Sequence, residues 1–200
     1  MTKWTMVADL RRCIGCQTCT AACRQANDTP PGERWREVLD VEIGTYPSVQ
    51  RVYVPVGCQQ CADAPCVDVC PTKASFYRSD GIVAIDRDLC IGCGYCAVAC
   101  PYQARFITNS KDEARHGVAT KCDFCSSRLD QAPVLGLVPG VDPEVTPACV
   151  NSCIAGALIF GDAEAPDSKV ADLAKKGFRL HEELGTETAF YYVSEDDPED

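Results

Sequence analysis

Short runs of apolar residues, separated by polar residues, glycine and proline, recur along the chain and predict short strands joined by loops. Such runs lie at residues 6–9, 38–43, 51–54, 105–108, 118–121 and 157–160. Residues 76–78 and 82–85 flank Asp80-Gly81, a sequence typical of a hairpin turn. Near Asp167 and Ser168, an N-cap signal predicts a helix that runs through Leu173 and ends at Gly177. We therefore expect an α+β fold with short strands, short helices and long loops.

Hydrocarbon side chains alone would give this fold a weak core. Leu, Ile, Val and Phe make up about 22% of the 200 residues, close to the roughly 20% below which chains tend to stay disordered. Cysteine is unusually frequent, with 16 residues. Covalent or metal cross-links are therefore expected to supply the missing stability, and the cysteines are expected to carry the function.

Charge and hydropathy exclude several classes of protein. A net charge of -10 argues against a phosphate-binding surface, so nucleic acid is not an expected partner. No stretch approaches the roughly 20 apolar residues of a membrane span, so no direct membrane span is expected. The first nine residues lack the apolar core of a secretory signal, so we expect no export signal of its own.

The sixteen cysteines form four groups of four with none left over. The groups are Cys13, Cys16, Cys19 and Cys23; Cys58, Cys61, Cys66 and Cys70; Cys90, Cys93, Cys96 and Cys100; and Cys122, Cys125, Cys149 and Cys153. The first and third groups read C-x2-C-x2-C-x3-C, the bacterial iron–sulfur spacing. The second group widens one gap, and the fourth has a long insert between Cys125 and Cys149. All four are therefore interpreted as one motif that binds [4Fe–4S] clusters.

Two other uses of cysteine compete with this interpretation. Eight disulfides would suit a secreted scaffold, but C-x2-C-x2-C crowds too many thiols locally to pair well. Structural zinc prefers two C-x2-C-like pairs separated by a dozen or more residues. Only the fourth group has such an arrangement, so zinc is an alternative for that group.

The turn between the first two cysteines of a group favours a compact cluster. Gly15 and Gly92 occupy this turn, where the lack of a side chain lets the backbone approach cluster sulfides. A short strand, an Asp and a CIGC turn recur 77 residues apart, which indicates an internal repeat. The fourth cysteine of each run, on the following short helix, points away from its own cluster. In two-cluster ferredoxins this cysteine binds the other cluster.

These motifs resemble the four-cluster electron-transfer (beta) subunits of molybdopterin oxidoreductases of the dimethyl sulfoxide reductase and polysulfide reductase type. The resemblance runs from about residue 4 to 160 and is carried by residues 9–19 (DLRRCIGCQTC), 58–71 (CQQCADAPCVDVCP), 80–83, 90–96 (CIGCGYC), 100–102 and 120–125. Arg24 and Ile154 depart from the family pattern, in which Pro often follows the fourth ligand.

The resemblance implies a set of ligands for each of four [4Fe–4S] clusters. Cluster A would be held by Cys13, Cys16, Cys19 and Cys153, and cluster B by Cys122, Cys125, Cys149 and Cys23. Cluster C would be held by Cys58, Cys61, Cys66 and Cys100, and cluster D by Cys90, Cys93, Cys96 and Cys70.

The resemblance also implies a doubled bacterial ferredoxin-like fold made of two intertwined two-cluster halves. Residues 1–50 and 105–165 would form the half that carries groups one and four. Residues 51–104 would form the half that carries groups two and three. Residues 166–200 would add a C-terminal helix, a strand and an acidic tail.

The implied function is electron relay rather than catalysis. The chain would pass electrons between a large molybdenum or tungsten bis-pterin catalytic subunit and a membrane anchor subunit that exchanges them with quinone. It would form a peripheral part of a membrane-associated complex, on a side that the sequence leaves open. The alternative is a polyferredoxin-like carrier or a hydrogenase-linked electron-transfer subunit.

Two further features have both a functional and an ordinary explanation. Lys121, Arg128, Arg11 and Arg12 lie beside ligands in the sequence, where they either raise cluster potentials or are ordinary solvated charges. The apolar segment 132–141, inside the insert, either packs on its own half or contacts a partner through Leu135, Leu137 and Val138.

Overall fold

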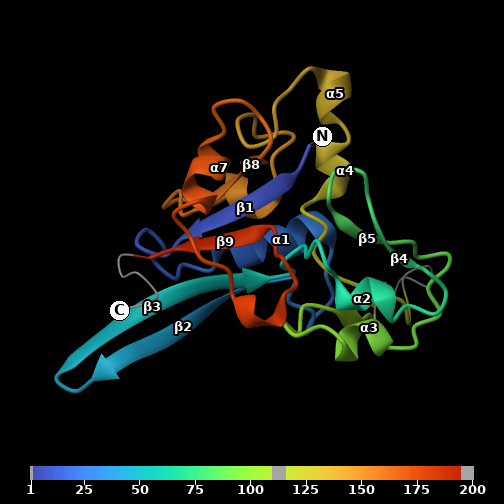
Figure 1. Ribbon diagram of the computed structural model, residues 1–200, viewed down its shortest axis with the longest axis horizontal. Coiled ribbons are helices and arrows are strands. Elements are labelled where there is room, and N and C mark those ends of the chain that lie inside the picture. Colours follow the sequence, from blue (N-terminus) through green and yellow to red (C-terminus); the bar gives the residue numbers. More distant parts are fainter. Residues whose placement is uncertain (1, 110–115, 195–200) are drawn as a thin grey trace.

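The computed structural model describes residues 2–109 and 116–194, and it shows a mixed α/β fold of short elements (Figure 1). The strands are β1 (Trp4–Asp9), β2 (Arg36–Thr45), β3 (Ser48–Gly57), β4 (Ser75–Tyr77), β5 (Val83–Ile85), β6 (Phe106–Ile107), β7 (Ala119–Thr120), β8 (Leu158–Asp162) and β9 (Phe190–Val193). The helices are α1 (Thr18–Asn27), α2 (Pro65–Asp68), α3 (Tyr95–Val98), α4 (Ser126–Leu129), α5 (Ala132–Leu135), α6 (Ala148–Asn151) and α7 (Lys169–Ala174), with a 3-10 turn at Glu182–Leu184.

A three-stranded sheet joins the two ends of the chain. In it β1 pairs antiparallel with β8 on one side and parallel with β9 on the other. Alternate residues of β1 face opposite sides of the sheet, as strand geometry requires. Met6 and Ala8 enter the main core, whereas Val7 packs with Val170 of α7 and with Val193.

The remaining strands form three two-stranded ladders, β2–β3, β4–β5 and β6–β7. The strands expected from apolar runs, including both arms of the hairpin at Asp80-Gly81, are confirmed. The helix expected after Ser168 is also confirmed as α7, since the Ser168 hydroxyl accepts a hydrogen bond of 3.3 Å from the Ala171 N–H. The expected acidic tail lies almost wholly outside the described residues.

The β2–β3 hairpin is longer than the sequence suggested. The apolar runs at 38–43 and 51–54 are the centres of two ten-residue strands in continuous register from Arg36↔Gly57 to Thr45↔Ser48. The tip of the hairpin extends away from the rest of the molecule (Figure 1). Because β3 spans residues 48–57, it crosses the boundary expected at residue 50.

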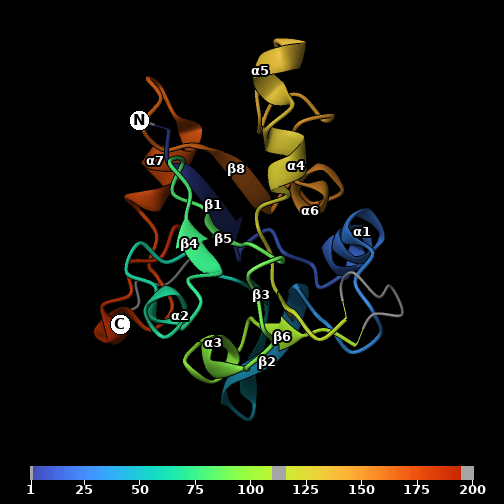
Figure 2. The ribbon, with the colours of Figure 1, turned by 90° about the vertical axis from the view of Figure 1, so that its right-hand side faces the viewer.

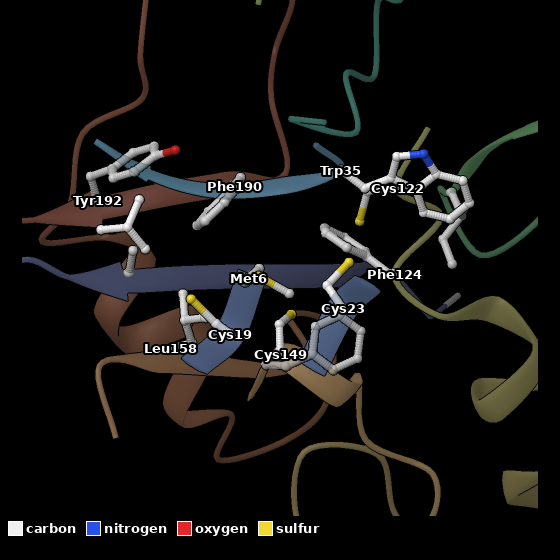
Figure 3. Close-up of a cluster of buried hydrophobic side chains, with 14 of the residues drawn as sticks. Met6, Cys19, Cys23, Trp35, Cys122, Phe124, Cys149, Leu158, Phe190 and Tyr192 are labelled. Atoms are coloured by element: carbon white, nitrogen blue, oxygen red, sulfur yellow. The ribbon is translucent and has the colours of Figure 1, made fainter. Parts of the chain in front are cut away.

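Cysteine completes the main core. Buried aromatic side chains from β8, β9 and nearby loops, including Phe160, Phe190 and Phe124, pack together with Cys19, Cys23, Cys122 and Cys149 (Figure 3). The Phe124 and Phe160 rings meet edge to face with centroids 5.3 Å apart. The expectation that hydrocarbon alone would not fill the core therefore agrees with the packing.

The insert between Cys125 and Cys149 contains α4 and α5 and lies at one extremity of the molecule (Figure 2). Val134, Leu135, Val138 and Val141 are exposed there, and Leu137 is half-buried. Within the described residues, no helix has the length and apolar character needed to span a membrane.

Candidate metal centres

Three open cavities are each lined by four cysteines, and in each cavity three come from one group and the fourth from another. One is lined by Cys13, Cys16, Cys19 and Cys153. A second is lined by Cys58, Cys61, Cys66 and Cys100. A third is lined by Cys70, Cys90, Cys93 and Cys96. We call these three sites A, C and D.

The other four cysteines, Cys23, Cys122, Cys125 and Cys149, are buried together in the core and are called site B. Cys23, Cys122 and Cys149 belong to one packed cluster beside Met6 and Phe124 (Figure 3). The amide nitrogen of Asn27 lies 3.7 Å from the sulfur of Cys23 and 3.8 Å from that of Cys125. Cysteines that are about 100 residues apart in the chain thus share one donor.

The cysteines of sites A, C and D surround a space rather than meet at a point. Among the residues that the structure describes, no three His, Cys, Asp or Glu side chains are grouped so as to hold a metal ion. The four cysteines of group four, the alternative zinc ligands, are also separated from one another. Cys153 lines site A, whereas the other three lie with Cys23. Four thiols around a shared space are the donor set of a [4Fe–4S] cluster.

Backbone N–H groups point at the fourth cysteine of three groups. Ser75 donates to the sulfur of Cys70 at 3.4 Å, Ala104 to Cys100 at 3.5 Å, and Ala157 to Cys153 at 3.3 Å. These donors are free because the preceding helices α2, α3 and α6 have only four residues each. Pro71 and Pro101 follow two of these cysteines, and proline cannot continue a helix.

In group one, the hydrogen bond to the sulfur of the fourth cysteine comes from a side chain. Arg24 occupies the position after the fourth ligand, where proline is common. The helix α1 is therefore not interrupted there and extends to Asn27, ten residues in all. Backbone N–H groups inside a helix are already bonded, so they are not available to Cys23. The side chain of Asn27, four residues after Cys23, supplies the donor instead. Ile154, the other departure from the family pattern, has no such effect, since α6 still ends at Asn151.

The two glycines singled out in the sequence both occupy crowded positions with positive φ. Gly15 has φ 69° and Gly92 has φ 66°, a conformation that favours glycine. A Cβ at Gly15 would overlap the Tyr53 ring, and a Cβ at Gly92 would overlap the Gly117 carbonyl. Both turns therefore need glycine because of their positive φ and the crowding by Tyr53 and Gly117, whereas the expected approach of the backbone to cluster sulfides stays a prediction.

Electrostatic interactions between side chains link the four sites in neighbouring pairs. The Cys19 thiol of site A is close enough to Cys149 of site B to raise its pKa, although burial is the larger cause. The pKa of Cys122 in site B, raised mainly by burial, is likewise influenced by Cys58 of site C. Arg105 lines site C and lies beside Cys96 of site D. The neighbouring pairs are therefore A and B, B and C, and C and D.

Exposure differs along this series. Cys16 in site A and Cys93 in site D are exposed, whereas all four cysteines of site B are buried. Burial raises the pKa of the thiols of Cys23 and Cys61 to about 12. A bond from the Thr18 hydroxyl lowers the pKa of Cys16. Since thiolates are the ligand form, binding of metal at the buried positions must release protons.

Three of the four cations that stand beside ligands in the sequence, Arg11, Lys121 and Arg128, already have partners. Arg11 pairs with Asp9 at 2.7 Å, and the buried Lys121 donates to the carbonyls of Val83 and Cys122. Arg128 donates to the Pro143 carbonyl. Sequence reasoning missed two other arginines, Arg36 and Arg105, which are 1% and 5% exposed beside the sites. Arg36 lies on the inward face of a strand, but nothing in its sequence context marks it as close to a cysteine.

Comparisons with known proteins agree with this picture. The family model of a 4Fe-4S dicluster domain matches residues 49–163. The chain is 38% identical to a subunit of the selenate reductase of Mesobacillus selenatarsenatis, with 96% of this chain and 72% of the relative aligned. It is 40% identical to a subunit of the tetrathionate reductase of Salmonella typhimurium, over 98% and 74% of the two chains. It is 36% identical to a subunit of the sulfite dehydrogenase of Allochromatium vinosum, over 96% and 83%.

Proposed function

Because the chain belongs to the family of iron–sulfur electron-transfer subunits of molybdopterin oxidoreductases of the dimethyl sulfoxide reductase type, we propose that it relays electrons through four [4Fe–4S] clusters. A bound [4Fe–4S] cluster supplies the ability to take up and release an electron. The chain itself supplies thiolate ligands, N–H donors to sulfur and apolar walls. Its role is to hold the redox centres, and no catalytic residue is assigned to it.

The proposed ligand sets are those that line the four sites. Cys13, Cys16, Cys19 and Cys153 serve site A; Cys23, Cys122, Cys125 and Cys149 serve site B; Cys58, Cys61, Cys66 and Cys100 serve site C; and Cys70, Cys90, Cys93 and Cys96 serve site D. Support comes from the three cysteine-lined cavities and from the buried site B. Sites A and B belong to residues 1–50 and 105–165, and sites C and D to residues 51–104, in a doubled ferredoxin-like fold.

One observation carries the relay: A neighbours B, B neighbours C and C neighbours D, and only sites A and D include an exposed cysteine, Cys16 in A and Cys93 in D. Electrons enter a protein relay where a redox centre lies near the surface, and burial protects the inner centres from water. Sites A and D are therefore the two ends at which partners exchange electrons with this chain.

The proposed partners are a large catalytic subunit with a molybdenum or tungsten bis-pterin and a membrane anchor that reacts with quinone. The relatives are named as subunits of reductases and of a dehydrogenase, which supports assembly with a catalytic subunit. In such an assembly the chain occupies a peripheral position at the membrane.

The test is anaerobic purification of the intact complex, with the partners identified by mass spectrometry and the clusters followed by magnetic resonance. A pterin-containing large subunit should accompany the chain, and a quinol added to membranes that contain the complex should reduce the clusters. Isolation of the chain alone, or with a nickel-containing hydrogenase subunit, would instead support the carrier or hydrogenase-linked alternative.

A further inference from the structure

Arg36, the first residue of β2, is a buried cation with few partners of its own. Its side chain is 1% exposed, and its guanidinium carbon lies 4.9 Å from the centroid of the Phe190 ring. One terminal nitrogen is 3.1 Å from the sulfur of Met6, which is a weak acceptor. The other terminal nitrogen, Nη1, and Nε have no hydrogen-bond partner. A buried guanidinium in this state is costly unless negative charge lies beside it.

Cysteines of two sites provide that negative charge when they are ligands. Cys149, Cys122 and Cys23, all of site B, lie close enough to Arg36 to interact with its charge. Cys19 of site A interacts with it as well. All four cysteines belong to the same packed core as Met6 and Phe190 (Figure 3). Arg36 therefore lies between two neighbouring sites of the first half.

Arg105 has the corresponding position in the second half. It is 5% exposed and lines the cavity of site C. Its Nη1 donates to the Ser75 hydroxyl at 2.7 Å, while Nε and Nη2 have no hydrogen-bond partner. Its charge interacts with Cys66 and Cys58 of site C and with Cys96 of site D. A second buried arginine thus lies between the second pair of sites.

Two other cations near the cysteines have partners outside the cysteine side chains. Arg11 has the Asp9 carboxylate, and Lys121 has two carbonyl oxygens. In contrast, Arg36 and Arg105 each leave two of three guanidinium nitrogens unbonded while facing cysteines of two sites. The two arginines are not equivalent in the sequence repeat, since Arg36 follows Cys23 by 13 residues and Arg105 follows Cys100 by five.

We propose that Arg36 is the shared countercharge of sites A and B, and that Arg105 is the shared countercharge of sites C and D. The proposal rests on the proposed function, because it concerns clusters bound by the cysteine sets given above. Adding an electron makes a thiolate-bound cluster more negative, so a fixed cation and N–H donors nearby stabilise the reduced state. Each arginine therefore raises the reduction potentials of both sites that it faces. Each arginine places a positive charge beside two sites and does not bind iron itself.

The test is a potentiometric titration of the intact complex, with each cluster followed by magnetic resonance, on Arg36→Met and Arg105→Met. Two of the four midpoint potentials should fall in Arg36→Met, and the other two in Arg105→Met. The expected shift is at least a tenfold change in the ratio of oxidised to reduced cluster at a fixed potential, which is about 59 mV for a one-electron couple. Arg36→Lys keeps the charge and should recover more than half of the shift.

Arg34→Met is the matched control, because Arg34 is two residues away, exposed and paired with Glu37. It should leave all four potentials unchanged. If Arg36→Met loses iron, Arg36→Gln, a second neutral variant, takes its place in the titration. Unchanged potentials in a fully loaded neutral variant, an equal shift at all four sites, or loss of iron from Arg36→Lys as well as from the neutral variants would overturn the proposal. A wild-type complex without four clusters would instead refute the proposed function.

Discussion

Gly92 lies so close to the carbonyl oxygen of Gly117 that the two residues leave no room for a side chain at position 92. Gly92 stands between Cys90 and Cys93, and the next segment of strand, β7, begins two residues after Gly117. Ala119, the first residue of β7, donates to the sulfur of Cys90 at 3.3 Å. The close approach of these two glycines therefore brings an N–H donor to site D.

We predict that Gly92→Ala will remove the cluster of site D. The added methyl group would force the Gly117 segment away and impose a positive φ on alanine. Iron content should fall by about a quarter, the share of one cluster among four. Gly94→Ala is the control, since Gly94 also has a positive φ but nothing lies within 4 Å of its Cβ position. That variant should lose only about 1–2 kcal/mol of stability and keep its iron. Equal iron content in Gly92→Ala and Gly94→Ala would show that the close approach of Gly92 to Gly117 is not needed for the cluster of site D.

A second prediction concerns the exchange of fourth cysteines between groups. Cys100 lines site C together with Cys58, Cys61 and Cys66, and not the cavity of its own run. Cys100→Ala should therefore alter the magnetic resonance signal of site C and leave that of site D in place. Cys70→Ala should have the reverse effect, because Cys70 lines site D. If each substitution instead abolishes the cluster of its own run, the fourth cysteines do not cross over.

Much of this site could be predicted from sequence because the cysteine spacing fixes local geometry. Three cysteines within seven residues have to curl around one centre, and a short helix sends the fourth elsewhere. The partners of that fourth cysteine depend on long-range packing, so they came only from a family resemblance. Arg36 was missed because burial of a strand residue is decided by its tertiary neighbours. The full length of β2 and β3 was missed because residues that extend them, such as Glu37 and Gln50, are polar and lie outside the apolar runs, although both are paired across the hairpin.

A third prediction concerns the insert, whose exposed side chains favour a contact with a partner over packing on its own half. Val134, Leu135 and Val138 are 85%, 54% and 57% exposed, so their apolar surface is free to meet another chain. Replacing all three with Ser should leave the four clusters intact and weaken co-purification of the catalytic subunit. The control is Leu184→Ser, at an exposed apolar residue on the 3-10 turn Glu182–Leu184. Full co-purification of the triple variant, or loss of its clusters, would count against docking at this surface.

A fourth prediction is that folding depends on the clusters. Cys23, Cys122 and Cys149 lie within the main core, so removing the metal leaves thiols where cross-links are needed. Binding free energy at such sites becomes folding free energy. Chelation of iron should therefore abolish cooperative thermal unfolding monitored by circular dichroism. A cluster-free chain that keeps a cooperative transition and its folded spectrum would show that the apolar core suffices.

If all sixteen cysteines bind iron–sulfur clusters, metal analysis of the anaerobically purified complex will show it. After the catalytic subunit is removed or accounted for, this chain should contain about 16 iron atoms and about 16 acid-labile sulfides, four of each per cluster. Zinc should be close to zero. Fewer than four clusters together with stoichiometric zinc would contradict the claim and assign a structural zinc site to some of the cysteines.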